Sequence, residues 1–237
     1  MRFEWDNEKI ELYVRASKET GFHKKIAEQI SSVLNKHDEL TDVGCGPGII
    51  DFELSQHVKS INAIDIEPEV IEYLQSEIKE NKITNIFPVI ADAALLDKSL
   101  GDVVLTCFFS GNEEAVVALI DASSRLSIIV THGEGSKTKP SKISGNKRKT
   151  SASDIERTLL DGDYDYKRKD LTLDFGQPLK TEEEALEFLE MYCTEDDPVL
   201  RKCKIEEGFS NLKPSCNPVY PYAIPNIKEV AIFIITK

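Results

Sequence analysis

The spacing of apolar residues predicts helices that alternate with short strands through the first half of the chain. Apolar positions recur every three or four residues across residues 7–34, with a break at Thr20 and Gly21, so one interrupted helix or two helices are expected there. The predicted order continues with a strand at 39–43, a helix at about 46–58, a strand at 60–65, a helix at 68–81 and a strand at 86–90. Strands at 102–107 and 126–131 have unbroken apolar centres, and Asn112 is a candidate cap for the helix between them. Because parallel strands need a crossover that is usually helical, this alternation predicts an α/β fold with a parallel sheet.

After His132 the pattern changes. Residues 133–149 carry six Lys or Arg against one Glu, among Gly, Ser and Pro, and show no periodicity, so we expect a mobile loop. Two Ser/Thr-x-x-acid patterns, at Ser151 and Thr181, predict capping boxes at the starts of further helices. A strand is expected at 164–175 and a last one at 230–236, whereas residues 194–225 show no pattern that assigns them.

Composition narrows the classes of partner. The 41% hydrophobic content of the 237 residues is enough for a globular core, and the net charge of −13 disfavours polyanions except at a local basic patch. The five cysteines are scattered and form no C-x-x-C pair, which argues against disulfides and a zinc site and suits a cytoplasmic protein. No targeting signal or membrane-spanning run is visible, so we expect no membrane partner and no metal.

Three glycines follow the first predicted strand and indicate a ligand site. Gly44, Gly46 and Gly48 would lie at the carboxyl end of that strand, where open parallel sheets bind ligands, and they let a ligand approach the backbone closely. Asp65 ends the next strand, seventeen residues after Gly48, and a carboxylate there can accept hydrogen bonds from both hydroxyls of a ribose. The glycine turn and this acid together predict a nucleoside site.

The glycine spacing argues against a dinucleotide. A G-x-G-x-x-G fingerprint would need a further glycine where Ile49 stands. Asp42, two residues before the first glycine, would be a poor neighbour for pyrophosphate, but it suits a ligand with an ammonium group, such as a methionine-derived sulfonium.

The segments DVGCGPG, AIDIEPE, IADAALL and DVVLTCFF resemble the successive motifs of class I S-adenosylmethionine-dependent methyltransferases over about residues 25–131. The resemblance implies a Rossmann-like seven-stranded, mostly parallel sheet in which only the last strand is antiparallel. It also implies S-adenosylmethionine as the cofactor. One domain, 1–237, would then comprise an N-terminal helical lid at 1–34, a cofactor-binding core at 35–132, a flexible basic loop at 133–150 and the rest of the sheet at 151–237, with a cap inserted at about 178–225.

The same resemblance assigns roles to individual residues. It places Asp42 and the glycine loop near the methionyl part, Asp65 on the ribose and Asp92 at the adenine amino group. The complete expected cofactor set is Asp42, Gly44, Cys45, Gly46, Gly48, Asp65, Ile66, Asp92, Ala93, Cys107, Tyr13 and His23. Plainer alternatives stay open: Asp65 or Asp92 could cap a helix or turn, and Tyr13 and His23 could simply pack the N-terminal helices against the sheet.

No residue stands out as the catalytic group. His132 is the one candidate for a general base, because it ends a central strand on the ligand side, and a structural histidine is the alternative. The segment CFFSGN replaces the Asn/Asp-Pro-Pro-Tyr motif of enzymes that methylate base or glutamine amines, which disfavours that chemistry. We therefore expect methyl transfer to a small-molecule acceptor. The alternatives are RNA methylation guided by the basic segment from Lys137 to Lys149, and a non-catalytic protein that binds the cofactor.

Overall fold

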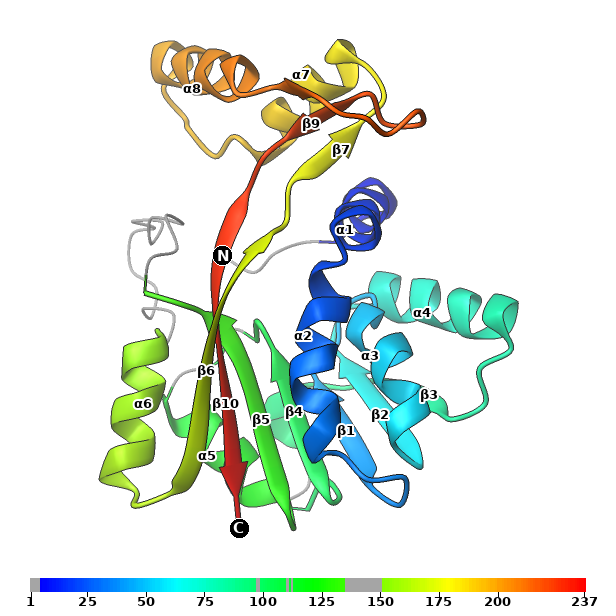
Figure 1. Ribbon diagram of the computed structural model, residues 1–237, viewed down its shortest axis with the longest axis vertical. Coiled ribbons are helices and arrows are strands. Elements are labelled where there is room, and N and C mark those ends of the chain that lie inside the picture. Colours follow the sequence, from blue (N-terminus) through cyan, green and yellow to red (C-terminus); the bar gives the residue numbers. More distant parts are fainter. Residues whose placement is uncertain (1–4, 97–98, 110, 112, 135–150) are drawn as a thin grey trace.

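A seven-stranded sheet with helices on both faces forms the body of the protein, and a smaller unit of strands and helices lies beyond one end of it (Figure 1). The computed structural model describes residues 5–96, 99–109, 111, 113–134 and 151–237. The helices are α1 (Asn7–Thr20), α2 (Phe22–Ile30), α3 (Ile49–Leu54), α4 (Pro68–Asn81), α5 (Glu113–Ala122), α6 (Ala152–Asp161), α7 (Glu182–Tyr192) and α8 (Pro198–Ser210), with short 3-10 turns η1 (Ser31–Val33), η2 (Ser55–His57) and η3 (Ala93–Leu95). The strands are β1 (Glu39–Val43), β2 (Ser60–Asp65), β3 (Ile86–Ile90), β4 (Val103–Cys107), β5 (Leu126–His132), β6 (Asp165–Asp174), β7 (Gln177–Leu179), β8 (Lys213–Pro214), β9 (Tyr222–Ile224) and β10 (Ile227–Thr236).

The order of strands in the large sheet is β3-β2-β1-β4-β5-β10-β6. Strand β10 runs antiparallel to both of its neighbours, and the pairs from β3 to β5 are parallel. This confirms the expected α/β, Rossmann-like sheet with only the last strand reversed. Strand order changes direction between β1 and β4, so the carboxyl ends of these two strands flank the crevice in which such sheets bind ligands.

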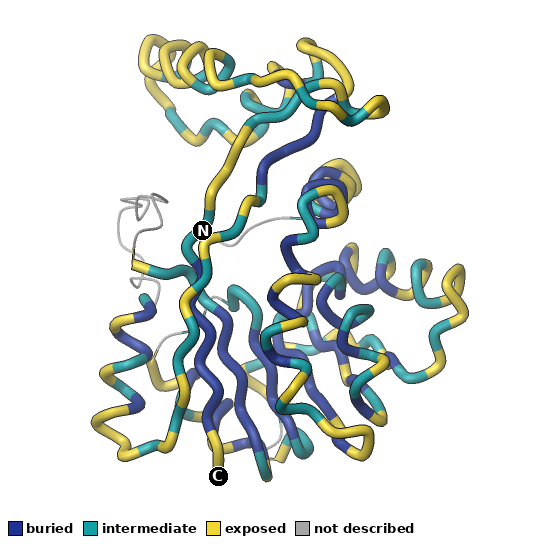
Figure 2. Tube along the Cα trace, in the orientation of Figure 1, coloured by how far each residue is buried: buried dark blue, intermediate teal, exposed yellow. Residues whose placement is uncertain are grey.

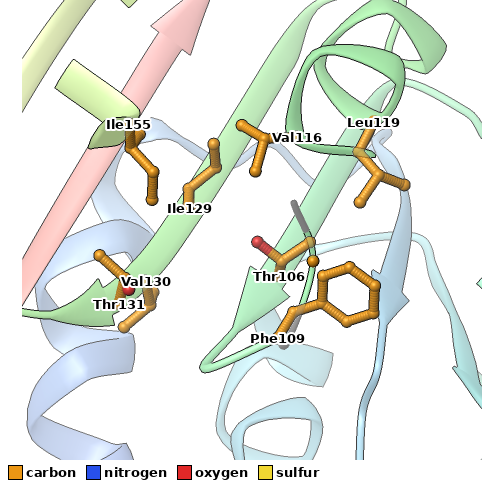
Figure 3. Close-up of a pocket in the computed structure, with 9 residues that line it drawn as sticks. Thr106, Phe109, Val116, Leu119, Ile129, Val130, Thr131 and Ile155 are labelled. Carbon is orange, nitrogen blue, oxygen red and sulfur yellow. The ribbon is translucent and has the colours of Figure 1, made fainter. Parts of the chain in front are cut away.

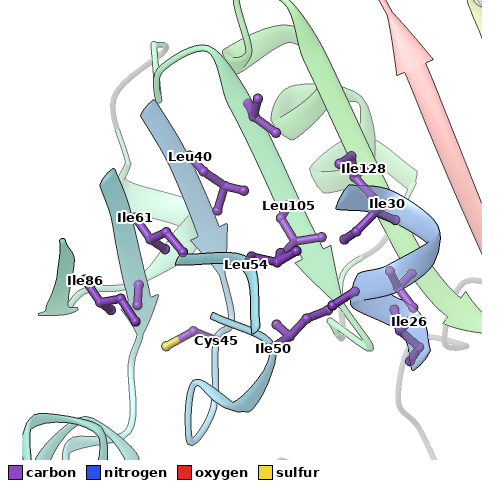
Figure 4. Packing of buried hydrophobic residues seen from close by; sticks show 14 of the residues in the cluster. Ile26, Ile30, Leu40, Cys45, Ile50, Leu54, Ile61, Ile86, Leu105 and Ile128 are labelled. Carbon is purple, nitrogen blue, oxygen red and sulfur yellow. The ribbon is translucent and has the colours of Figure 1, made fainter. Parts of the chain in front are cut away.

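Buried aliphatic side chains hold α2 and α3 against one face of the sheet (Figure 4). Ile26 and Ile30 of α2 and Leu54 of α3 pack with Leu40 and Leu105 of the central strands, and all five are fully buried. Burying one such side chain contributes about 1.5–3 kcal/mol. A second cluster, centred on Phe233 of β10, joins α5 and α6 to the opposite face. Together these clusters fix the strand ends that carry the predicted site.

The break between the two N-terminal helices lies at a glycine, as the sequence predicts. Gly21 ends α1 in the left-handed conformation, with φ +66°, and its N–H bonds the carbonyl of Ser17. A new helix therefore begins at Phe22 and changes direction. Helix α2 packs beside α3, while α1 lies over the carboxyl ends of the strands (Figure 1).

Residues 177–224, close to the predicted cap, form the smaller unit. Strands β7, β9 and β8 make a three-stranded antiparallel sheet with α7 and α8 beside it, and the long strands β6 and β10 connect this unit to the body (Figure 1). Its surface is largely exposed, and α8 has no buried residue (Figure 2). We call it the cap unit.

Local boundaries differ from the sequence-based predictions at a few places. Helix α3 begins at Ile49, not near residue 46, because Gly48 adopts φ +69°, which no helix accommodates. The capping box at Ser151 forms, but at Thr181 only half of it does, since the Glu184 carboxylate accepts from the Lys180 N–H instead of the Thr181 N–H. The predicted cap Asn112 and the basic segment at 135–150 lie outside the described residues.

Candidate functional site

The glycine loop between β1 and α3 has a backbone that only glycine adopts readily. Gly44, Gly46 and Gly48 have φ values of +78°, +54° and +69°. A Cβ at Gly44 would lie 2.7 Å from Phe109, and one at Gly48 would lie 2.5 Å from Leu74. At Gly46, which is buried, a Cβ would lie 3.8 Å from Trp5, at an ordinary van der Waals distance. Two of the glycines thus avoid collisions with neighbouring side chains, and the third is covered by Trp5.

The side chain of Asp65 ties this loop to the end of β2. Its Oδ2 accepts from the Gly46 N–H at 2.9 Å and its Oδ1 from the Glu67 N–H at 3.0 Å. The N-cap of α4 is Glu67, so Asp65 is not the cap of that helix. Each carboxylate oxygen retains acceptor capacity, and the side chain is half-buried at the strand end. Asp65 is thus held in place by backbone donors beside the glycine loop.

Two carboxyl groups are completely buried beneath the loop. Asp42, on β1, and Asp51, in the first turn of α3, are both 0% exposed. None of their four oxygens has a hydrogen-bond donor among the described residues. Burial raises the pKa of both groups, and the field of Asp65 further raises the pKa of Asp42. Asp42 was predicted as a site residue, whereas Asp51 was not, because a single acid in a short amphipathic helix resembles any other polar position.

At the end of β3 the expected adenine residues form a turn. The Asp92 Oδ1 accepts from the Ala94 N–H at 2.9 Å and caps η3, which begins at Ala93. One oxygen of Asp92 therefore caps a turn, as in the plainer of the two interpretations from the sequence. Nearby in sequence, Ile66 and Leu95 are 38% and 84% exposed. Exposed apolar side chains at two neighbouring strand ends suit a flat, apolar ring.

An aromatic cluster joins the N-terminal segment to the end of β6, and its Trp5 contacts the glycine loop. The Tyr13 ring lies 5.3 Å from Trp5 and 5.2 Å from Phe175, measured between ring centroids. Its hydroxyl lies 3.0 Å from His23 Nε2, and His23 Nδ1 lies 2.6 Å from the Ser17 hydroxyl. Burial raises the pKa of Tyr13 and lowers that of His23 to about 3, so both are neutral near pH 7. The bond between Tyr13 and His23 therefore ties α1 to α2.

The ends of β4 and β5 provide Cys107 and His132. Burial raises the pKa of the Cys107 thiol, which therefore stays protonated and unreactive. Phe108 has φ +57°, a strained conformation for a bulky residue, and its ring lies 4.8 Å from His132 and 5.8 Å from Phe22. No sequence pattern signalled this backbone conformation. It turns the chain sharply at the strand end, where the predicted site lies.

Among the residues that the structure describes, the glycine loop lines neither of the following two hollows. An apolar cavity of about 20 Å³, lined by residues such as Val116, Ile129 and Ile155, lies between β4, β5, α5 and α6 (Figure 3). It has room for about one water molecule and cannot hold a nucleoside. A larger hollow of about 440 Å³ lies along α1, between Tyr73 of α4 and Tyr220 of the cap unit. Across the residues that the structure describes, no group of His, Cys, Asp or Glu could hold a metal ion, and no helix is long and apolar enough to cross a membrane.

Comparisons with known proteins relate this architecture to methyltransferases. Residues 40–126 match the family model described as a methyltransferase domain. The structure resembles YcgJ from Bacillus subtilis, at 15% identity and a TM-score of 0.62, covering 91% of this chain and 99% of that one. It also resembles a putative methyltransferase from Bacillus halodurans, at 14% identity and a TM-score of 0.56, covering 92% and 99%. A third resemblance is to TYW2 from M. jannaschii in complex with AdoMet, at 14% identity and a TM-score of 0.50, covering 91% and 75%.

The matched segment contains the glycine loop and the ends of β1, β2, β3 and β4. The likeness to these structures confirms the Rossmann-like fold expected from the sequence, and the family match relates residues 40–126 to methyltransferase domains.

Proposed function

We propose that this protein, whose residues 40–126 match a methyltransferase domain, transfers the methyl group of S-adenosylmethionine to a small-molecule acceptor. The observation that carries the proposal is the pairing of Gly46 with Asp65, in which an N–H of the glycine loop donates to a carboxylate at the neighbouring strand end. This arrangement places a glycine backbone and a fixed acid side by side, as a nucleoside site needs, while Ile49 stands where a dinucleotide fingerprint has its last glycine.

The residues present fit the proposed cofactor. The ribose hydroxyls would donate to Asp65, and the adenine would lie near Ile66, Asp92 and Ala93. The unpaired buried carboxyl of Asp42 fits the ammonium group of the methionyl part, because a buried acceptor without a donor is costly until a cation reaches it. Gly44, Cys45, Gly46 and Gly48 would face the methionyl chain. These assignments rest on residue chemistry at the ends of β1, β2 and β3.

When bound, S-adenosylmethionine supplies an electrophilic methyl group on a positively charged sulfur. The chain's contribution is then alignment and exclusion of water. Trp5 packs against Gly46 of the glycine loop, and Tyr13 and Phe175 join it in an aromatic cluster, whose faces also suit a cationic sulfur. Cys107 stays a neutral thiol and offers no competing nucleophile. His132, the candidate base from the sequence, ends β5 beside Phe108 and keeps that role as a proposal.

The lid and the charge of the protein favour a small acceptor. Helix α1 and the cap unit extend over the carboxyl ends of the strands, so an acceptor must fit beneath them (Figure 1). The net charge of −13 repels a polyanion such as RNA. The acceptor is therefore a metabolite small enough to enter the crevice beneath α1 and the cap unit.

Thermal denaturation with S-adenosylhomocysteine tests cofactor binding. At a ligand concentration about a hundredfold above Kd, the melting temperature should rise by roughly 5–10 °C, while NAD should not change it. Asp65→Ala should weaken binding about a hundredfold and remove most of the rise, because two charge-assisted hydrogen bonds to the ribose are lost.

Asp102 provides the matched control. It also accepts from a backbone N–H, that of Glu39, and from the Ser124 hydroxyl, but it precedes β4 at the opposite end of the sheet. Asp102→Ala should lower the melting temperature of the free protein and keep the full rise with ligand. An Asp65→Ala protein with an undiminished rise would contradict the ribose assignment.

The acceptor is sought by incubating the protein with methyl-labelled cofactor and fractionated metabolites. Label in a small molecule is the expected outcome. Label in RNA instead would contradict the small-molecule proposal, and cofactor binding without label in either pool would indicate a non-catalytic binding protein.

A further inference from the structure

The fold gives the buried pair Asp42 and Asp51 no hydrogen-bond donor outside the pair. Both side chains are 0% exposed, and in the part of the chain that the structure describes no other group donates to any of their oxygens. A carboxyl group that serves only packing would be replaced by an apolar or hydrogen-bonded side chain, since unsatisfied buried acceptors destabilise the folded state. The pair thus has the acceptor capacity of two carboxyl groups, and no donor from outside the pair is bonded to it.

The two carboxyl groups face each other under the glycine loop. Each is the other's interaction partner in the electrostatics of the site. Asp51 is the third residue of α3, where a carboxylate often accepts from free helix N–H groups. Here the N–H groups of Asp51 and Phe52 bond the Gly48 carbonyl instead, and the Asp51 carboxyl is directed to Asp42.

The groups that surround the pair supply no positive charge. Asp65 of β2, Cys45 of the loop, Cys107 of β4 and Tyr13 of α1 are the titratable groups whose fields couple to it among the described residues. Each of them is negative or neutral. Two carboxylates enclosed in this way repel each other without compensation, so one proton remains on the pair while no cation is present.

We propose that Asp51 is a positioning residue of the ammonium subsite, and that the Asp42–Asp51 pair loses its shared proton when the ammonium group of the cofactor binds. This rests on the proposed function. In the empty site the pair carries one negative charge. On binding, the carboxyl O–H bond breaks, the proton passes to solvent and the ammonium keeps its own protons. The second carboxylate then balances the incoming cation, and the local charge is unchanged.

The chemistry of the ligand determines whether the proton leaves. S-adenosylhomocysteine carries the ammonium group, whereas 5′-methylthioadenosine has the same adenosine and a thioether but no amino acid tail. Only S-adenosylhomocysteine brings a positive charge that can balance the second carboxylate of the pair. The pair therefore selects for the amino acid end of the cofactor and makes its affinity depend on pH.

Titration calorimetry in buffers of different ionisation heat measures the proton directly. Near neutral pH, wild-type protein should release up to about one proton on binding S-adenosylhomocysteine and none on binding 5′-methylthioadenosine. The affinity for S-adenosylhomocysteine should rise by up to about tenfold per pH unit while the empty pair is protonated. Asp51→Asn should bind the same ligand with no proton release and a flat pH profile, while Asp65→Ala should bind weakly and still release the proton.

The outcomes separate the two proposals. Binding of S-adenosylhomocysteine to the wild type without proton release, or with equal release for 5′-methylthioadenosine, overturns the role of the pair and leaves the proposed function intact. Failure to bind either ligand overturns both. If Asp51→Asn does not fold, the comparison of the two ligands on wild-type protein decides the matter alone.

Discussion

At the scale of single residues, the buried carboxyl groups of Asp42 and Asp51 couple folding to pH. Both pKa values are raised on folding, chiefly by burial, so the folded protein holds a proton that the unfolded chain loses near pH 4. The stability tied to this proton is fully present below that pH and is lost as the pH rises through the folded pKa values, by up to about 1.4 kcal/mol per pH unit.

Asp51→Asn should therefore flatten the fall in stability of the ligand-free protein between about pH 6 and pH 8. Urea denaturation at a series of pH values measures the slope. Asp121→Asn, at a carboxylate that is 61% exposed, is the control and should leave the slope unchanged. If the Asp51→Asn protein keeps the wild-type slope, the shared proton does not exist.

Residue chemistry predicted Asp42, Asp65 and the three glycines but not Asp51. Asp42 and Asp65 lie near the carboxyl ends of β1 and β2, and the glycines follow β1, where residues can reach a ligand. Asp51 lies inside a helix, and its burial depends on how α3 packs against β1, which periodicity alone does not reveal. Whether the other predicted contacts, such as Tyr13 and His23, touch the cofactor stays a prediction.

At the scale of elements, local sequence determines where α3 begins. Gly48 takes the left-handed conformation directly before the helix, and its bare Cα packs on Leu74 of α4. The first turn of this short helix therefore follows the glycine loop directly. The capping box at Ser151 forms from local sequence alone, whereas Glu184 is drawn away from Thr181 by Lys180 and Arg15. Helix α8 has no buried face, so no apolar periodicity could predict it.

Gly48→Ala should destabilise the protein by about 2–4 kcal/mol, because it adds backbone strain of roughly 1–2 kcal/mol to a collision with Leu74. Gly21→Ala is the matched control. Gly21 has a similar φ of +66° but only Lys25 within reach, at 3.8 Å, so it should show the strain alone. Denaturant unfolding measures both, and equal losses would show that contact with Leu74 does not matter.

At the scale of the whole molecule, Arg15 of the lid helix joins the body to the cap unit. Its guanidinium, 7% exposed, donates to Glu184 at 2.7 Å and lies 5.0 Å from the centre of the Tyr220 ring. It also pairs with Glu11 of its own helix. Asn217 of the cap unit also donates to Glu19 of α1 at 2.6 Å, and Arg15 donates to the Pro178 carbonyl. The position of the cap unit therefore depends on α1 as well as on β6 and β10.

Arg15→Gln should loosen the cap unit, since it removes the ion pair and leaves the half-buried Glu184 without its cationic partner, at a cost of about 1–3 kcal/mol. Hydrogen exchange in β7, β9 and α7 should become roughly tenfold faster or more, with little change in β1 and β4. Lys202→Gln, at a side chain that is 78% exposed, should change neither. Uniform acceleration across the sheet would contradict a local role.

The central claim is that the crevice at the carboxyl ends of β1 and β4, beside Asp65 of β2, binds S-adenosylmethionine along the glycine loop. A crystal structure with S-adenosylhomocysteine tests it most directly. The account predicts the ribose hydroxyls within hydrogen-bond distance of the Asp65 carboxylate and the ammonium group against Asp42 and Asp51, with Trp5 and Tyr13 above. A ligand bound in another part of the fold, or a crevice still filled by side chains while Asp65 contacts no sugar, would contradict it.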